Sequence, residues 1–294
     1  MRLNYIQKIQ KSLKRYKTIH TNRATSRLLD GSYRSIYKGR SMNFDELREY
    51  VVGDDVKDID WKASARSQKL LIRQYIAEKK HNVMLILDTN RRMLANANEE
   101  QEKKEVALMS AGTLAYLVSG NGDYVSATYA TRESVQHYPF QTGLMNVENI
   151  LAHYDRDVTM ENHSDINTPL EYVIHHFRRR MILIIVTDIE GIRRISETTL
   201  KRLLIMHDVL VINISDATSA GQAVFDMDRN EYLPAFFTRD KKLARMERAR
   251  RMEVNRQAAE KLKRLGIASS TIDHTEELDV KIIELLNKHK IEKR

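Results

Sequence analysis

The chain lacks cysteine altogether, which excludes disulfide bonds and metal sites built on thiolates. It has only three prolines in 294 residues, so long uninterrupted elements are expected. It also lacks an apolar run long enough to cross a membrane, and no secretory signal opens the sequence. These absences predict a cytoplasmic protein with no transmembrane segment.

Several catalytic motifs are missing as well. There is no Walker-type glycine loop for phosphates, no His-Glu-x-x-His zinc pair and no serine nucleophile elbow. The ten histidines are scattered along the chain rather than grouped. The sequence therefore argues against P-loop nucleotide hydrolysis, zinc proteolysis and serine hydrolysis.

The net charge of +9 raises the question of an anionic partner. A nucleic acid or an anionic membrane surface would attract such a chain. The positive excess is divided, however, between residues 8–23 and residues 239–264, and the second stretch alternates basic with acidic residues. That alternation is typical of a solvated helix face. Binding to nucleic acid or to membranes is therefore kept as an alternative and is not the favoured interpretation.

Three apolar runs predict strands that are buried on both faces: Val83–Leu87, Met181–Val186 and Val209–Ile214. Helical periodicity fills the stretches between and after them, which is typical of an α/β fold with a mostly parallel sheet flanked by helices. Asp88 follows the first run, and Asp188 follows the second. Because parallel strands end at one edge, where such sheets bind ligands, we expect both carboxylates at that edge.

Two further helices are predicted towards the ends of the chain. Residues 1–20 carry apolar side chains at spacings of three or four, which predicts a helix packed on the domain or on a partner. A helix lying on a membrane surface is the alternative. Residues 21–47 are expected to hold turns between short extended pieces. Residues 239–265 predict a long charged helix with an apolar side made of Leu243, Met246, Ala258 and Leu262.

Residues 44–66 combine charges of both signs with the only tryptophan, Trp61. Gly53 and Asp54 predict a turn into a short helix with Asp54 as its cap. The apolar face predicted for this helix consists of Val56, Ile59 and Ala63.

The acidic residues of this segment, Asp54, Asp55, Asp58 and Asp60, have two interpretations. They could form a metal or acid/base cluster, but their spacing does not match the calcium loop pattern. The segment also holds Arg48, Lys57, Lys62 and Arg66. An ion-pair network that locks a helix onto the sheet is therefore the favoured interpretation.

This segment resembles the bacterial family called domain of unknown function 58. The resemblance covers roughly residues 30–190, and it implies a von Willebrand factor A-like domain in residues 79–294, with long C-terminal helices. Residues 1–78 would then be an extension, made of the N-terminal helix and the family-signature region, that packs on the core. The residues that carry the resemblance include Arg48, Tyr50, Gly53, Asp54, Asp55, Asp60, Trp61 and Arg66.

The resemblance also implies where a magnesium ion would bind in such domains. Asp88 matches the first aspartate of the motif, Asn90 stands in place of its first serine, and Asp188 matches the aspartate of the third loop. Thr168 is the candidate for the loop threonine. Arg92 stands in place of the second serine, and a guanidinium cannot ligate a metal.

Arg91 or Arg92 would instead lie between the two aspartates and pair with both. We therefore predict a degenerate metal site and no cofactor, with magnesium as the alternative.

We predict a non-enzymatic protein that binds other proteins. The resemblance implies a MoxR-type AAA+ ATPase and an unknown client protein as partners, because genes of the family commonly lie beside a gene for such an ATPase. The strand-end edge with Asp88, Asn90, Thr168 and Asp188 is the first predicted surface, and residues 239–264 are the second. The enzyme alternative is a metal-dependent hydrolase that uses Asp88 and Asp188, or the cluster from Asp54 to Asp60.

Overall fold

The computed structural model describes residues 4–15, 33, 46–74, 80–217, 225–226, 231–232 and 241–292. The turns predicted within residues 21–45 lie outside these ranges, apart from the single residue Tyr33. Between residues 218 and 240 the structure describes only the short strands β8 (Phe225–Asp226) and β9 (Glu231–Tyr232).

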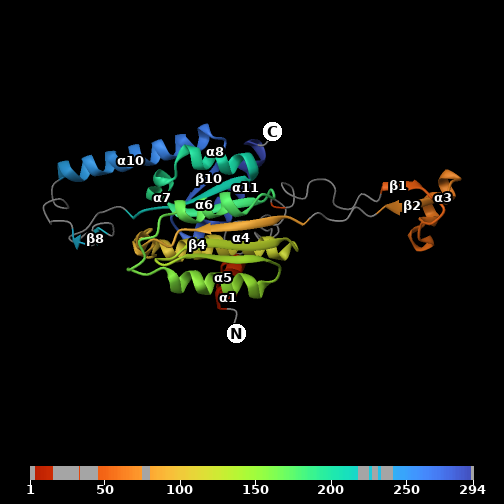
Figure 1. Ribbon diagram of the computed structural model, residues 1–294, viewed down its shortest axis with the longest axis horizontal. Helices are drawn as coiled ribbons and strands as arrows, with labels where there is room; N and C mark the ends of the chain where they lie inside the picture. The colour runs from red at the N-terminus through yellow and green to blue at the C-terminus, as the bar shows by residue number, and fades with distance from the viewer. Residues whose placement is uncertain are drawn as a thin grey trace.

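A six-stranded sheet forms the centre of the molecule, in the order β10-β7-β6-β3-β4-β5 (Figure 1). Five of its strands are parallel, and the edge strand β5 is antiparallel to β4. The predicted α/β class is thus confirmed. The strands are β3 (Asn82–Leu87), β4 (Tyr124–Ala130), β5 (Val135–Gln141), β6 (Ile182–Asp188), β7 (Asp208–Ile214) and β10 (Ala268–Ile272).

The two faces of the sheet carry two separate hydrophobic cores. Along β3, Val83, Leu85 and Leu87 belong to one core, whereas Met84 and Ile86 belong to the other. Successive side chains of a strand point to opposite faces, so a strand covered on both sides must be apolar at every position. This is why the central strands have no polar alternation.

Helices cover both faces. One core is closed by α1 (Asn4–Arg15), α4 (Lys103–Gly120), α5 (Leu144–Asp157) and α11 (Leu278–Glu292). The other is closed by α6 (Asn167–His176), α7 (Ile189–Arg194), α8 (Glu197–Met206) and α10 (Lys241–Arg264). The short helices η4 (Arg91–Leu94) and η5 (Thr275–Glu277) follow β3 and β10 in the chain.

The N-terminal helix α1 packs on the domain, as the favoured interpretation predicted. Its apolar face, with Ile6, Ile9 and Leu13, is buried in the first core against α4 and α5. The buried carboxylate of Glu148 on α5 accepts hydrogen bonds from the backbone N–H groups of Tyr5 at 3.0 Å and of Ile6 at 2.9 Å. Because this face is covered, it is not available as a membrane-surface helix.

Among the side chains of the long helix α10 that the structure describes, the buried ones lie in its second half. Ala258 and Leu262 are buried in the second core, as predicted, but Met246 is exposed. The predicted continuous apolar side is therefore wrong at Met246. The side chain of Leu243 lies outside the described set.

Residues 46–74, which we call the signature unit, fold as β1 (Glu46–Glu49), η3 (Val56–Asp58), α3 (Trp61–Ser67) and β2 (Leu71–Gln74). Strands β1 and β2 pair as an antiparallel ribbon. The packing contacts described for these elements are with one another, and Figure 1 draws the unit apart from the main body. The packing of this region on the core, expected from the sequence, is therefore seen for α1 and not for the signature unit.

The predicted single helix capped by Asp54 is also wrong. The short helix η3 is capped by Asp55, and α3 is capped by Asp60, whose carboxylate accepts from the N–H groups of Lys62 and Ala63. Between them Ile59 is extended and forms a bridge with Ile72 of β2. This pairing interrupts the helix, so Val56, Ile59 and Ala63 do not share one helical face.

Within the residues that the structure describes, no helix is both long and apolar enough to span a membrane.

Candidate functional site

The carboxyl ends of β3, β6 and β7 form the edge at which the site was predicted, and we call this edge the rim. Asp88 follows β3 and is 1 % exposed. Its Oδ1 accepts from the backbone N–H of Asn90 at 2.9 Å, and its Oδ2 accepts from Thr187 Oγ1 at 2.5 Å. Its backbone carbonyl accepts from the Tyr154 hydroxyl of α5 at 2.8 Å. The first aspartate is thus held from both sides of the sheet.

Asp188 ends β6 and is also 1 % exposed. Its Oδ1 accepts from the backbone N–H of Gly191 at 2.8 Å, so the carboxylate caps α7. An acidic cap is favourable there because it compensates the unpaired N–H groups and the positive end of the helix dipole. Its other oxygen, Oδ2, faces two cations.

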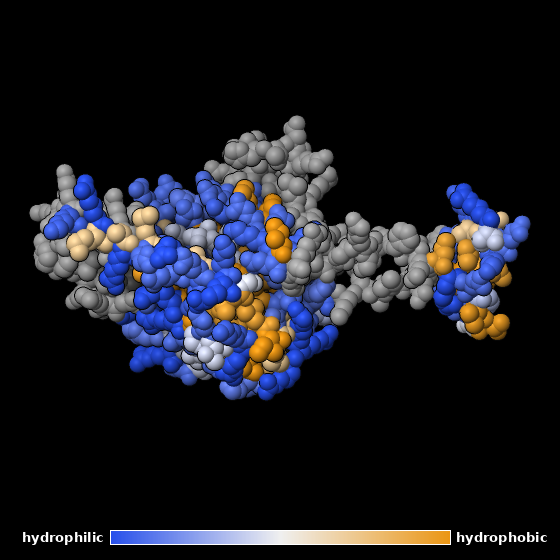
Figure 2. Space-filling model, turned by 90° about the horizontal axis from the view of Figure 1, so that it is seen from above, coloured by the Kyte–Doolittle hydropathy of each residue, from blue (hydrophilic) through white to orange (hydrophobic). Residues whose placement is uncertain are grey.

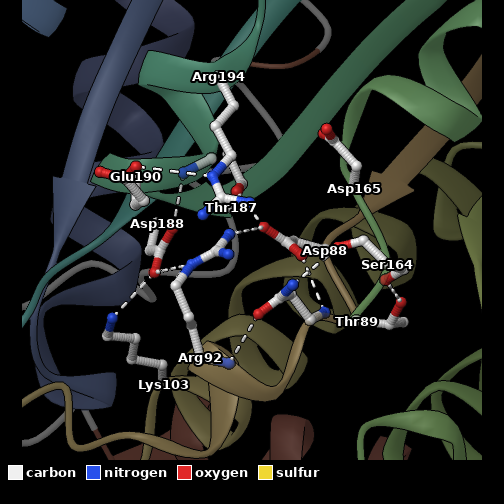
Figure 3. Close-up of polar contacts among 12 residues, drawn as sticks. Asp88, Thr89, Arg92, Lys103, Ser164, Asp165, Thr187, Asp188, Glu190 and Arg194 are labelled. Carbon is white, nitrogen blue, oxygen red and sulfur yellow. Dashed lines mark hydrogen bonds and ion pairs between the residues drawn. The ribbon is translucent and has the colours of Figure 1, made fainter. Parts of the chain in front are cut away.

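Arg92 is the first of these cations and lies between the two aspartates (Figure 3). Its Nε lies 3.3 Å from Asp188 Oδ2, and its Nη2 lies 3.4 Å from Asp88 Oδ2. The short helix η4, capped by Asn90, presents Arg92 to the rim, where it is buried. The sequence expectation that an arginine pairs with both carboxylates is confirmed for Arg92.

Lys103 is the second cation, and the sequence analysis missed it. It is the first residue of α4, it is 2 % exposed, and its Nζ lies 3.0 Å from Asp188 Oδ2. The same ammonium pairs with Asp216, just beyond β7. The signal in the sequence was the position of Lys103 at the start of a helix, because the helix dipole favours acidic residues at that end.

The pKa values of the rim follow from this arrangement. Burial and the neighbouring Asp188 raise the pKa of Asp88, and Arg92 and Thr187 only partly offset that rise. Burial also acts to raise the pKa of Asp188, but Lys103 and Arg92 outweigh it and hold this pKa well below its usual range. Burial would lower the pKa of Lys103, yet Asp188 and Asp216 raise it, so the ammonium stays protonated at neutral pH. These directions keep Asp188 and Lys103 in their charged forms, and the raised pKa makes Asp88 the first of the two rim carboxylates to take up a proton as the pH falls.

Gly191 is required by this packing. A Cβ atom built on Gly191 would lie 1.9 Å from Thr187 Oγ1 and 2.9 Å from Asp88 Oδ2. Real Cβ contacts are never so short, so any side chain here displaces the hydroxyl that binds Asp88. The sequence analysis missed Thr187 and Gly191, although Gly191 stands three residues after Asp188, at the third position of the helix that Asp188 caps.

The structure brings three of the four predicted rim residues together and places the fourth elsewhere. Asn90 is buried, and its side-chain amide donates to the Ser164 carbonyl at 2.8 Å. Thr168 instead lies exposed in the first turn of α6. Among the described hydrogen bonds, none joins Thr168 to the rim aspartates or to Asn90. Instead of Thr168, Ser164 places its hydroxyl beside the segment that follows β3, where its Oγ lies 3.0 Å from Thr89 Oγ1.

A divalent metal does not fit the residues of the rim. All four oxygens of Asp88 and Asp188 accept hydrogen bonds from protein groups, and two of these oxygens face Arg92 or Lys103. Side chains that only donate hydrogen bonds and carry positive charge repel a metal ion. Within the described residues, no group of three or more acidic, histidine or cysteine side chains is arranged to hold a metal.

The signature unit holds the remaining predicted residues. Arg48 pairs with Asp54 through two hydrogen bonds, from Nη1 to Oδ2 at 2.7 Å and from Nη2 to Oδ1 at 2.6 Å. Asp54 also accepts from the Val51 N–H, and Gly53 takes φ +112° in this turn. Of the four aspartates in the unit, Asp54 is ion-paired, and Asp55 and Asp60 act as helix caps. The predicted ion pairing is thus seen at Asp54, and the short helices that Asp55 and Asp60 cap belong to the signature unit.

The rest of the signature residues are on the surface of the unit. Trp61 is 64 % exposed at the start of α3, Arg66 is exposed, and Tyr50 is half-buried. Val52 is 95 % exposed at the turn. Figure 2 shows apolar surface on this unit, away from the main body.

The chain thus forms an α/β domain with a mostly parallel sheet, helices on both faces, and aspartates at the carboxyl ends of β3 and β6. The chain belongs to the family described as "Protein of unknown function DUF58", whose model matches residues 46–261. The resemblance inferred from the signature residues is thus confirmed.

Sequence relatives are likewise of unknown function. The uncharacterized proteins Rv1480 of Mycobacterium tuberculosis and Mb1516 of Mycobacterium bovis are each 26 % identical over 194 residues. The match covers 64 % of this chain and 60 % of each relative, so the chain spans less than two thirds of their length.

Similar solved structures include an aerotolerance-related membrane protein from Bacteroides fragilis, with 14 % identity, a TM-score of 0.44, and coverage of 71 % of this chain and 99 % of that one. Another is the conserved hypothetical protein BatB from Bacteroides thetaiotaomicron, with 13 % identity, a TM-score of 0.43, and coverage of 71 % and 98 %. A third, the SpRpn10 VWA domain, has 10 % identity, a TM-score of 0.33, and coverage of 47 % and 77 %. Likenesses at this level do not extend to function.

Proposed function

We propose that this protein is a non-enzymatic, cytoplasmic interaction module that binds a partner protein through its signature unit. The observation that carries the proposal is the contrast between the two candidate surfaces. The carboxylates of the rim are buried and fully paired, whereas the signature unit exposes apolar side chains.

The rim is a poor catalytic or contact surface in this chain. Asp88, Asn90 and Asp188 are each at most 4 % exposed, so a substrate or a partner cannot touch them without opening the structure. General acid/base catalysis needs a group within hydrogen-bond reach of a substrate. The metal-dependent hydrolase therefore has no site at the rim. In the signature unit, Asp54 is ion-paired and Asp55 and Asp60 act as helix caps, which counts against an acid/base cluster there.

The signature unit, in contrast, buries few apolar side chains and exposes several. Of its apolar side chains whose burial the structure describes, Ile59 and Ile72 are buried. Chains shorter than about 40 residues usually need disulfides, metals or a partner for stability. Trp61, Val51 and Val56 are each more than half exposed, as is Val52. Large exposed apolar patches mark interaction sites, and tryptophan is among the residues that contribute most to binding energy.

The proposed partners are a MoxR-type AAA+ ATPase and a client protein. The support is the confirmed family membership, because the resemblance that led to it implies such a partner. The second predicted surface, on α10, is kept as a secondary contact. Its first half is without described packing and exposes Met246 and Met252.

The test measures binding of the purified full chain to the MoxR-type ATPase of the same genome by biolayer interferometry. We expect Trp61→Ala and Val52→Asp each to weaken binding about tenfold or more, as loss of a central interface side chain does. Ile205→Asp is the matched control, because Ile205 is 83 % exposed on α8 of the main body. It should change the affinity less than about twofold.

Two results would contradict this proposal in different ways. If the wild-type chain does not bind the ATPase at all, the partner is wrong. If it binds and all three variants bind equally well, the signature unit is not the interface. Melting curves of the variants, compared with wild type, show that a loss of binding does not come from unfolding of the main body.

A further inference from the structure

The two buried cations of the rim together carry the charge of one divalent ion. Arg92 and Lys103 supply two positive charges, and they lie among the carboxylates of Asp88, Asp188 and the less buried Asp216. Two carboxylates so close together in a low-dielectric interior repel each other unless a cation lies between them. Arg92 contacts both carboxylates, and Lys103 contacts Asp188 (Figure 3).

The position of Lys103 indicates that its charge is needed at the rim and not for its helix. It is the first residue of α4, where a positive charge opposes the helix dipole. Its burial adds a desolvation cost that an exposed lysine would not have. Lys103 occupies this position despite both unfavourable contributions, and from it the side chain reaches Asp188 and Asp216.

The two cations also link the ends of neighbouring strands through ion pairs. Asp88, Asp188 and Asp216 follow the neighbouring parallel strands β3, β6 and β7. Arg92 links the first two strand ends, and Lys103 links the second to the third. Metal ions bound at such edges perform the same linkage through oxygen ligands.

We propose that Arg92 and Lys103 form a permanent internal cation that takes the place of a divalent metal between the strand-end aspartates. The rim is thereby closed to metal-dependent recognition, in which a partner's carboxylate completes the coordination of the ion. This proposal concerns the stability and the ion dependence of the chain itself. It holds whether or not the signature unit binds an ATPase.

The first test compares melting temperatures of the wild-type chain in EDTA and in excess Mg²⁺ or Mn²⁺. We expect the wild type to melt at the same temperature in all three solutions. We expect the variant Arg92→Ser/Lys103→Ala to melt lower than wild type in EDTA. It should recover at least half of that loss when Mg²⁺ or Mn²⁺ is added, and adding Asp88→Asn to this variant should abolish the recovery.

A second variant keeps the proposal testable if the double variant does not fold. Lys103→Met retains the length of the side chain without its charge, and it should lower the melting temperature by about 6–20 °C. Lys104→Met is the matched control, because Lys104 is the next residue of α4 and pairs with Asp155 nearer the surface. Its melting temperature should fall by at most about 2 °C.

Three results would overturn the proposal. The first is a wild-type melting temperature that rises with Mg²⁺ and loses the rise in Asp88→Asn. The second is a Lys103→Met variant that melts like wild type. The third is a folded double variant that gains nothing from either metal ion.

Discussion

Replacing Gly191 by alanine should destabilise the protein, although helix propensity alone predicts the opposite. Alanine in place of glycine inside a helix is worth about 1 kcal/mol of stabilisation. At this position of α7, however, the new Cβ would lie 1.9 Å from Thr187 Oγ1. The hydroxyl must leave, and its 2.5 Å hydrogen bond to the carboxylate of Asp88 is lost. Overpacking costs about 1–3 kcal/mol, and a hydrogen bond to a charged group contributes about 1.5–3 kcal/mol.

The net expectation for Gly191→Ala is a loss of about 2–5 kcal/mol in the free energy of unfolding, measured by urea titration. Gly120→Ala is the control, because Gly120 ends α4 and a Cβ there meets nothing within 4 Å. It should be neutral or stabilising by up to about 1 kcal/mol.

A double-mutant cycle with Thr187→Ala tests the cause. Once the hydroxyl has been removed, Gly191→Ala should cost clearly less than in the wild type, because only the approaches of 2.9 Å to Asp88 Oδ2 and 3.1 Å to the Cβ of residue 187 remain, so the two changes should be non-additive. Additive costs, or a Gly191→Ala variant as stable as Gly120→Ala, would refute the reasoning.

Two further predictions concern regions outside the rim. Glu148→Gln removes the negative charge that accepts from the N–H groups of Tyr5 and Ile6, so hydrogen exchange should show weaker protection of residues 4–15; unchanged protection would mean that apolar packing alone holds α1. Burial lowers the pKa of His207, and Arg180 adds to this effect while Asp208 opposes it. Neutral His207 therefore contributes stability that is present above its ordinary pKa of 6.5 and is lost as the pH falls through the folded-state pKa. Replacing His207 by leucine should therefore flatten the fall in stability between about pH 7 and pH 5, measured by urea titration at each pH, and an unchanged fall would contradict this.

The sequence predicts the central sheet well because its strands follow a local rule. Every residue of β3 from Val83 to Leu87 is buried, and such a run has one simple explanation in an α/β protein. The positions of Asp88 and Asp188 follow from the same rule. Either Arg91 or Arg92 was expected between them, because a buried guanidinium needs carboxylate partners, and the structure places Arg92 there.

The parts that the sequence did not predict depend on contacts between distant segments. Lys103 reaches the rim from a helix that begins more than ten residues after Arg92, and Thr187 matters only because Gly191 leaves room for it. Thr168 was predicted from a loop position, but α6 begins at Asn167 and turns it to the surface. In the signature unit, the pairing of Ile59 with Ile72 separates two short helices, which are capped by Asp55 and Asp60 and not by Asp54.

Under the proposed function, the rim contributes to the stability of the chain, and the signature unit contributes to partner binding. Charge at the rim is buried and paired, so a change there acts on folding, and it reduces partner binding only in proportion to the unfolded fraction. The exposed apolar side chains of the signature unit, such as Val52 and Trp61, contribute little to folding because they contact few groups of their own chain. Variants of the two regions should therefore separate when affinity is plotted against the free energy of unfolding. Lys103→Met should lose stability and keep the affinity of its folded fraction, whereas Trp61→Ala should keep stability and lose affinity.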